Sequence, residues 1–388
     1  MAMLAAVAGP GCAEAEDYPA GNRSTMWTNG DKFRIGSFRH MSDIYFSRRI
    51  RHPSVVSALP MGEPLRLRAL DDYVTDSLTT GFLVMKDGKI VYERYALGAD
   101  QHSLLTSWSM AKSITSTLIG FAIGDGLIKS VDDPIDKYVP ELKDSGYAGV
   151  PIKAILQMSS GVDFNEEYDT EDSDSADMWD ATIGNNDDSF TEVLQDLERG
   201  GPPFAKFNYV GVDTLALGLL LRKVTGRTLS DYLSAKLWEP LGMESDATWN
   251  LDSDERDANE AAFCCINAVL RDYARFGQFI LNEGAWQGKQ LLAKTWVHEA
   301  TTPDMNQIMP GHLHPGWDVG YQYQWWIMPP DQDWLHGFEA QGVNGQFIYV
   351  NPEEQLVMVV TSAWPNAADG PRWERLHSLF WNIVKALR

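Results

Sequence analysis

The chain has 388 residues, of which 44% are hydrophobic and 11% aromatic. This composition is typical of a globular protein that is long enough to bury one large core or two coupled cores. The formal net charge of −22 argues against a basic face for nucleic acid or anionic membranes, and the apolar runs after the N-terminus fall short of the roughly 20 residues that cross a bilayer. We therefore expect neither a nucleic-acid partner nor a membrane span.

The N-terminal segment 1–15 is apolar and built from small residues. It fits the remnant of a secretion signal, but it has no positively charged start and its apolar run is short, so a flexible leader fits it as well. The first alternative places the protein in the bacterial periplasm and the second in the cytoplasm. Residues 1–75 as a whole are expected to form an irregular arm that wraps over the main body.

The three cysteines are Cys12, Cys264 and Cys265. Neighbouring cysteines rarely pair, because the geometry of such a link is strained. The spacing also fits no zinc motif, and the eight histidines show no metal-binding pattern. We therefore expect no disulfide and no metal, and we interpret Cys264 and Cys265 as small buried packing residues.

A β-hairpin is predicted over residues 81–96, because β-branched and aromatic residues flank the turn pair Asp87-Gly88. A short loop then leads to Ser109 and Lys112, which open an apolar helical stretch. Residues three apart on a helix share a face, so Lys112 can reach the Ser109 hydroxyl, as a lysine-assisted serine nucleophile requires. The same spacing fits a capping serine and a lysine that extends to solvent, and spacing alone does not decide between them.

Residues 129–264 are rich in helices and loops. Helices are expected over 152–158, 191–197, 212–224 and 228–237. Between the first two lies an acidic stretch, 166–188, which lacks the glycine of an EF-hand loop. We expect this stretch to be a solvated loop, long enough to cover a substrate.

The C-terminal part begins with an amphipathic helix over 267–282. Strands are then predicted over 321–328, 347–350 and 355–362, and a final helix over 372–388. His298 and His377 lie in helical contexts and are expected at the surface.

Strands at both ends and helices in the middle predict an α/β (α+β) fold, in which helices flank an antiparallel sheet and an all-helical subdomain is inserted. The expected α/β domain comprises residues 76–128 and 265–388, and the helical subdomain comprises 129–264. A site would lie where the two parts meet.

Three segments fit one site in this arrangement: Ser109-Met-Ala-Lys112, the Tyr209 segment 207–213, and the segment 340–346 around Gly342. With them, the chain resembles the serine β-lactamase-like hydrolases: class C β-lactamases, family VIII carboxylesterases and, most of all, nylon-oligomer (6-aminohexanoate-dimer) hydrolases. The other stretches that carry the resemblance are Asn165-Glu-Glu-Tyr168, Gln324-Trp-Trp326 and Ser362-Ala-Trp-Pro365. It covers roughly residues 76–385.

The resemblance implies a β-lactamase-like fold and a serine hydrolase of amide or ester bonds that needs no cofactor. Ser109 would be the nucleophile, Lys112 would help to deprotonate it, and Tyr209 would be the general base and acid, with a pKa lowered by the nearby ammonium. The backbone N–H groups of Ser109 and Val343 would bind the oxyanion. Gly342 would let its strand approach closely.

The implied partner is a small-molecule ester or amide. Its contacts would come from Tyr168, Asp174, Trp326, Gly342 and Asn344, with Asp174 facing a substrate ammonium. A homodimer remains an open alternative to a monomer.

Two motifs depart from the β-lactamases and penicillin-binding proteins. Ala340-Gln341-Gly342 replaces Lys-Thr-Gly, so the cation that holds a β-lactam carboxylate is absent, and Asp213 follows Tyr209 by four residues in place of the Tyr-x-Asn pattern. An amidase or carboxylesterase is therefore favoured over a β-lactamase or D-alanyl-peptidase. The alternative from another class is a catalytically silent sensor on the same fold.

Overall fold

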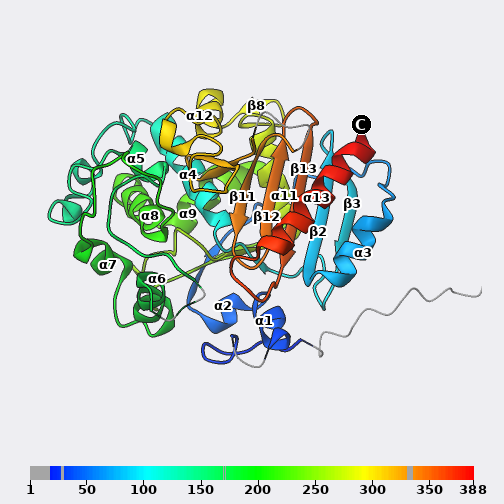
Figure 1. Ribbon diagram of the computed structural model, residues 1–388, viewed down its shortest axis with the longest axis horizontal. Coiled ribbons are helices and arrows are strands. Elements are labelled where there is room, and N and C mark those ends of the chain that lie inside the picture. The colour runs from blue at the N-terminus through cyan, green and yellow to red at the C-terminus, as the bar shows by residue number, and fades with distance from the viewer. Residues whose placement is uncertain (1–17, 28–29, 169, 171, 330–334) are drawn as a thin grey trace, which may run out of the picture.

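The computed structural model describes residues 18–27, 30–168, 170, 172–329 and 335–388 (Figure 1). Segment 1–15 and Cys12 lie outside the described residues. A seven-stranded antiparallel sheet forms one side of the molecule, in the order β3-β2-β13-β12-β11-β10-β9. Its strands are β2 (Thr79–Lys86), β3 (Lys89–Tyr95), β9 (Gly320–Gln322), β10 (Trp325–Ile327), β11 (Phe338–Gly342), β12 (Gln346–Asn351) and β13 (Leu356–Ser362).

The two faces of this sheet bury alternate residues of each strand, as a sheet covered on both sides requires. Phe82 and Val84 of β2 pack in a cluster with α3 (Arg68–Asp76) and α13 (Gly370–Leu387). Leu83 of the same strand packs into the main core, where α11 (Leu270–Leu281) lies against β12 and β13. Strands from the two ends of the chain thus form one sheet, as predicted.

The helical part lies beside the sheet, and α4 (Met110–Gly124) joins the two (Figure 1). Its other helices are α5 (Ile152–Leu156), α6 (Asp174–Trp179), α7 (Phe190–Asp196), α8 (Gly211–Thr225), α9 (Leu229–Leu233) and α10 (Glu239–Leu241). Helix α12 (Lys294–Ala300) follows α11, and short 3₁₀ or π turns cover Ile135–Lys137, Pro140–Leu142, Asp180–Gly184, Ser234–Trp238 and Asn306–Ile308.

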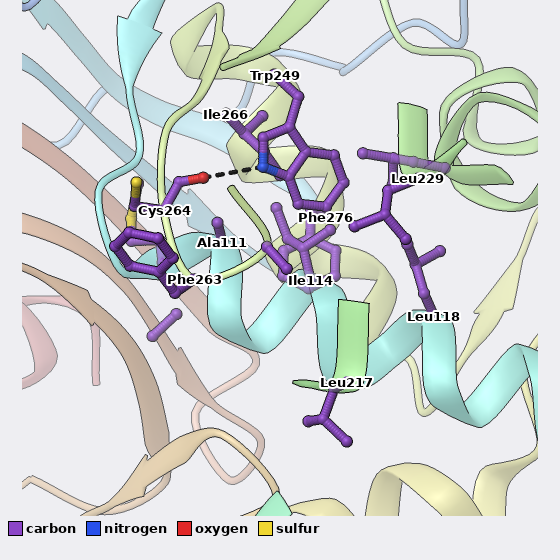
Figure 2. Packing of buried hydrophobic residues seen from close by; sticks show 14 of the residues in the cluster. Ala111, Ile114, Leu118, Leu217, Leu229, Trp249, Phe263, Cys264, Ile266 and Phe276 are labelled. Carbon is purple, nitrogen blue, oxygen red and sulfur yellow. Dashed lines mark hydrogen bonds between the residues drawn. The ribbon is translucent and has the colours of Figure 1, made fainter. Parts of the chain in front are cut away.

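Helix α4 is buried almost along its whole length. Ile114 and Leu118 are fully buried, and the helix contacts both α8 and β11 (Figure 2). Burying aliphatic side chains of this size removes them from water at a gain of about 1.5–3 kcal/mol each. The start of α4 is therefore held rigidly between the helical part and the sheet.

A second sheet, in the order β1-β5-β6-β4, lies next to the start of α4. Its strands are β1 (Ser47–Ile50), β4 (Leu105–Thr106), β5 (Ala247–Asn250) and β6 (Ile266–Ala268), and a separate small hairpin pairs β7 (Ala285–Trp286) with β8 (Lys289–Gln290). The expected irregular arm carries regular structure: α1 (Asp31–Ser37), α2 (Met41–Ile44), β1 and α3. Pairing of β1 with β5 ties this arm to the body.

Most of the predicted helices and strands are confirmed. The helix expected over 267–282 begins at Leu270, because residues 266–268 form β6. Three further local differences occur. The acidic stretch contains α6 and a π turn, because Ser173 caps α6 and Met178 is buried. The strand expected over 321–328 divides into β9 and β10, because Tyr323 and Gln324 adopt positive φ and turn the chain.

The third difference is His377, which is fully buried rather than exposed. Its Nε2 lies 3.0 Å from Oε1 of Glu339, and this pair joins α13 to β11. His298 is exposed as expected. None of the helices within the described residues is both long and apolar enough to cross a bilayer.

Candidate active site

Ser109 and Lys112 lie at the start of α4, where the predicted one-turn spacing brings their side chains together. The Lys112 Nζ is 2.9 Å from the Ser109 Oγ. Ser109 is the residue that precedes the helix, yet its hydroxyl does not cap the helix. Lys112 is 1% exposed, so it does not extend to solvent. Both observations contradict the purely structural interpretation of this pair.

Burial makes Lys112 a weak base that can release and accept a proton near neutral pH. Loss of water lowers its pKa to about 8, and the charge of Glu166 partly opposes this effect. A second hydrogen bond from Nζ to the carbonyl of Phe263, 3.2 Å away, fixes the amine beside Ser109. Part of the Lys112 population is therefore neutral and able to take the Ser109 proton.

Tyr209 completes the polar group, but its protonation differs from the expectation. Its ring centroid is 4.8 Å from the Lys112 Nζ, and it packs against Trp326 and Tyr321 at 5.4 and 5.9 Å. Burial raises the pKa of Tyr209 above its ordinary value, the Ser109 hydroxyl lowers it in part, and the charge of Glu166 raises it further. The expected lowering of this pKa is therefore wrong, and the raised pKa keeps the Tyr209 phenol neutral.

The end of β11 lies directly against Ser109. A methyl group built at Gly342 would stand 2.5 Å from the Ser107 carbonyl oxygen and 3.0 Å from the Ser109 nitrogen. Such distances leave room for glycine alone, as expected for this position. Within the described part of the chain, neither the Ser109 nor the Val343 amide has a hydrogen-bond acceptor of its own. Both N–H groups are available to an oxyanion.

Trp108, the residue before Ser109, is held in a left-handed conformation with φ of 41°. Its indole packs against Trp27 and Phe38 of the N-terminal arm, at 5.7 and 5.4 Å, and against Trp179 of α6, at 5.8 Å. A non-glycine residue in this conformation persists only where its surroundings fix it. The arm and α6 therefore help to set the position of Ser109.

Tyr168 and Glu166 lie near the Ser109 group, on the loop before α6. The Tyr168 hydroxyl donates to Oε1 of Glu166 at 2.6 Å, and Oε2 of Glu166 accepts from the Gly211 amide at the start of α8 at 2.7 Å. Burial of the hydroxyl, together with the Glu166 charge, holds the pKa of Tyr168 well above its ordinary value. Tyr168 remains 40% exposed and can contact a ligand from the solvent side.

The other expected substrate-contact residues have different surroundings. Trp326 packs on Tyr209 and belongs to the site's aromatic wall. The carboxylate of Asp174 accepts from the Asn165 amide at 2.7 Å and braces the loop before α6. Asn344 is 3% exposed and donates to the Trp364 carbonyl at 2.8 Å. These contacts give Asn344 a role in shaping the loop after β11.

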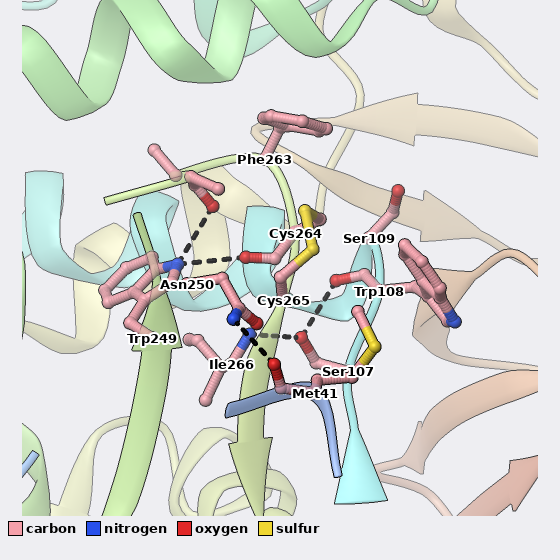
Figure 3. Close-up of a disulfide and its surroundings, with 12 residues drawn as sticks. Met41, Ser107, Trp108, Ser109, Trp249, Asn250, Phe263, Cys264, Cys265 and Ile266 are labelled. Carbon is pink, nitrogen blue, oxygen red and sulfur yellow. Dashed lines mark hydrogen bonds between the residues drawn. A yellow bond between two sulfur atoms is a disulfide. The ribbon is translucent and has the colours of Figure 1, made fainter. Parts of the chain in front are cut away.

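The two neighbouring cysteines overturn an expectation. Cys264 and Cys265 are joined by a disulfide, with their Cα atoms 3.7 Å apart, close behind Ser107 and Ser109 (Figure 3). The expected absence of a disulfide is therefore wrong. The expected burial is confirmed, since Cys264 and Cys265 are 2% and 0% exposed. The pairing is local and goes with a backbone turn at Cys265, which has a φ of 69°. The spacing of cysteines in a sequence does not reveal such a turn.

Sequence reasoning also missed two groups that act on Lys112. The sequence marks Glu166 only as part of the motif 165–168, although the charge of its carboxylate raises the pKa of both Lys112 and Tyr209. The Phe263 carbonyl is a backbone group and leaves no signal in a sequence. No cluster of three or more His, Cys, Asp or Glu residues that could hold a metal occurs among the residues that the structure describes.

The fold and the juxtaposed serine and lysine define this protein as a serine hydrolase with a β-lactamase-like fold. The chain belongs to the Beta-lactamase family, whose profile matches residues 68–379. It is 28% identical over 333 residues to the 6-aminohexanoate-dimer hydrolase of Paenarthrobacter ureafaciens, covering 83% of this chain and 82% of that protein.

Solved structures share the fold. A Bacillus anthracis protein provisionally named as a 6-aminohexanoate-dimer hydrolase superposes with a TM-score of 0.82 and 24% identity, covering 94% of this chain and 97% of that one. A family VIII carboxylesterase superposes with a TM-score of 0.63 and 18% identity, covering 84% and 99%. The predicted fold and the resemblance are confirmed.

Proposed function

We propose that this protein hydrolyses small-molecule amides or esters through an acyl-enzyme on Ser109. The observation that carries the proposal is the contact of the Ser109 Oγ with a buried lysine whose pKa is about 8. Neutral Lys112 takes the hydroxyl proton as Ser109 attacks the carbonyl carbon of the substrate. The Ser109 and Val343 amides bind the oxygen that becomes negative.

The second half of the reaction needs a proton for the leaving group. Tyr209 is a neutral phenol next to Lys112, so it passes its proton to the departing amine or alcohol and recovers one from the Lys112 ammonium. Water then attacks the ester bond to Ser109, and the same groups run the steps in reverse.

The substrate class follows from the walls of the site and from the relatives. Trp326 and Tyr168 offer aromatic and phenolic contacts, and a linear amide or short ester fits such a surface. Ala340 supplies no cation for a carboxylate. Together with the Paenarthrobacter relative, these features favour an amidase of the 6-aminohexanoate-dimer type or a carboxylesterase over a β-lactamase or D-alanyl-peptidase.

The test is a hydrolysis panel of p-nitrophenyl esters and the linear 6-aminohexanoate dimer, run on the wild type and on Ser109→Ala. Removal of the nucleophile should lower kcat by on the order of a thousandfold or more. Ser116→Ala is the matched control, because Ser116 is a buried serine of the same helix whose hydroxyl has no hydrogen-bond partner among the described residues. A fluorophosphonate adduct found on any residue other than Ser109 would refute the assignment, and an unlabelled wild type would favour the silent sensor.

The assembly state is a separate part of the proposal. A homodimer and a monomer are the two alternatives, and light scattering coupled to size-exclusion chromatography distinguishes them. A mass equal to one chain would exclude the homodimer, and a mass of two chains would exclude the monomer.

A further inference from the structure

The run 263–266 holds both ends of the nucleophile motif. At one end, the Phe263 carbonyl accepts from the Lys112 Nζ at 3.2 Å. At the other, the Ile266 amide donates to the Ser107 Oγ at 3.0 Å, and the Ile266 carbonyl accepts from the Ser107 amide at 2.7 Å (Figure 3). The Cys264–Cys265 disulfide lies between these two anchors. A displacement of this run would therefore reach Lys112 and Ser107 together.

The backbone around the disulfide is fixed on every side. The Cys264 carbonyl accepts from the Trp249 indole at 2.9 Å, and the Cys265 carbonyl accepts from the Asn250 amide at 3.1 Å. The Cys264 amide donates to the Ala261 carbonyl at 2.9 Å. These bonds hold the run only if Cys265 keeps its positive φ of 69°, a conformation that glycine adopts freely and other residues resist.

We propose that the Cys264–Cys265 disulfide is a positioning element for Lys112, because the link fixes the turn at Cys265 that aims the Phe263 carbonyl at the lysine amine. This inference rests on the proposed role of Lys112. A neutral amine has two N–H groups and one lone pair. The Nζ donates to the Ser109 Oγ in this structure. When the amine is neutral and the Phe263 carbonyl holds one N–H, the lone pair can face the Ser109 hydroxyl and accept its proton.

Reduction would remove this constraint. A phosphine or a dithiol supplies two electrons, the S–S bond breaks, and each sulfur takes up one proton to become a thiol. Cys265 can then leave its left-handed conformation, and the Phe263 carbonyl moves away from Lys112. Water entering beside Nζ would raise the Lys112 pKa toward its ordinary value, while Ser109, Glu166 and Tyr209, the other polar groups that face the amine, stay in place.

The first measurement is a thiol count on the denatured, unreduced wild type. The chain has three cysteines, so a disulfide leaves one free thiol per chain, and reduction raises the count to three. Three thiols before reduction would overturn the proposal.

The second measurement compares two variants without the disulfide. Cys264→Ala combined with Cys265→Ala removes the link and disfavours the turn, whereas Cys264→Ala combined with Cys265→Gly removes the link but permits the positive φ. We expect the double alanine variant to lower kcat by about tenfold or more with little change in KM. It should also move the acidic limb of the pH profile of kcat/KM to higher pH. The glycine variant should recover most of the loss. Wild-type kcat and pH profile in the alanine variant would overturn the proposal.

Reduced wild type provides the same test if the alanine variant does not fold. Fluorophosphonate labelling of Ser109 should slow on reduction and recover on reoxidation. Equal labelling rates of the oxidised and reduced forms would overturn the role of the disulfide and leave the serine hydrolase intact. Absence of labelling in the oxidised form would refute the proposed function, and this inference would fall with it.

Discussion

Gly342 lies so close to Ser109 that a methyl group at its Cα would stand 3.0 Å from the Ser109 nitrogen. This contact joins β11 to the start of α4, and we propose that it brings the Val343 amide, one residue further on, to the Ser109 amide. The two donors of the proposed oxyanion hole thus depend on the absence of a single side chain.

Replacing Gly342 with alanine should therefore separate the two amides. The added methyl meets backbone atoms of Ser107 and Ser109, which cannot rotate away as a flexible side chain would. We expect kcat to fall by about a hundredfold or more, the loss typical of one missing oxyanion donor.

The matched control for this change is Gly124→Ala at the end of α4, where an added methyl meets no atom of the described residues within 4 Å. This variant should keep full activity, and it should gain about 0.5–1 kcal/mol of unfolding free energy because alanine restricts the unfolded chain. Unchanged kcat in Gly342→Ala would show that the Val343 amide is not an oxyanion donor.

The pH dependence of the reaction should follow Lys112. Its pKa is lowered from 10.5 to about 8, and only the neutral amine accepts the Ser109 proton, so kcat/KM should rise as pH increases through about 8 and then level off. Lys112→Arg keeps the positive charge at all these pH values and should lose most of the activity. The profile is measured with an ester, after subtraction of its spontaneous hydrolysis. A profile that falls across this range would contradict the role of Lys112.

The parts of the molecule that could be predicted from the sequence are those set by neighbouring residues along the chain. The Asp87-Gly88 hairpin, the start of α4 at Ser109 and the one-turn spacing to Lys112 follow from turn chemistry and helix periodicity, and the structure agrees. Groups that meet only through tertiary packing were not predictable in this way. The Phe263 carbonyl on Lys112 and the buried His377–Glu339 pair are of this kind.

Two of the expectations that were wrong, the Tyr209 pKa and the unpaired cysteines, share a physical cause. The expected lowering of the Tyr209 pKa considers only the charge of Lys112. Lys112 is itself partly neutral, and burial of the phenol has the largest effect on the Tyr209 pKa. The cysteine pair was judged from average geometry, although the turn at Cys265 lets the two sulfurs meet. Both errors concern the environment of a group rather than its identity.

The preference for esters over β-lactams should be large. β-Lactam substrates lose a charge-assisted contact of roughly 1.5–3 kcal/mol where Ala340 replaces the lysine of the β-lactamases and penicillin-binding proteins. We expect kcat/KM for a short p-nitrophenyl ester to exceed that for nitrocefin by orders of magnitude. Ala340 is 1% exposed, so a lysine introduced there is not a clean control, and the comparison is made on the wild type. Similar values for the two substrates would contradict the expected substrate class.

Tyr209→Phe should distinguish a proton donor from a group that only packs. The ring would keep its contacts with Trp326 and Tyr321, so the fold and KM should change little. Because the raised pKa keeps the phenol protonated, its loss should matter most where the leaving group needs a proton. An amine leaving from an amide needs one, whereas p-nitrophenolate leaves as an anion. We therefore expect kcat for an amide to fall by about a hundredfold or more and kcat for a p-nitrophenyl ester to fall much less. Both substrates are measured on one preparation of the variant, so partial unfolding cannot produce the difference. An equal loss on both would mean that Tyr209 only orients Ser109, and the Lys112 ammonium would then be the group that protonates the leaving amine.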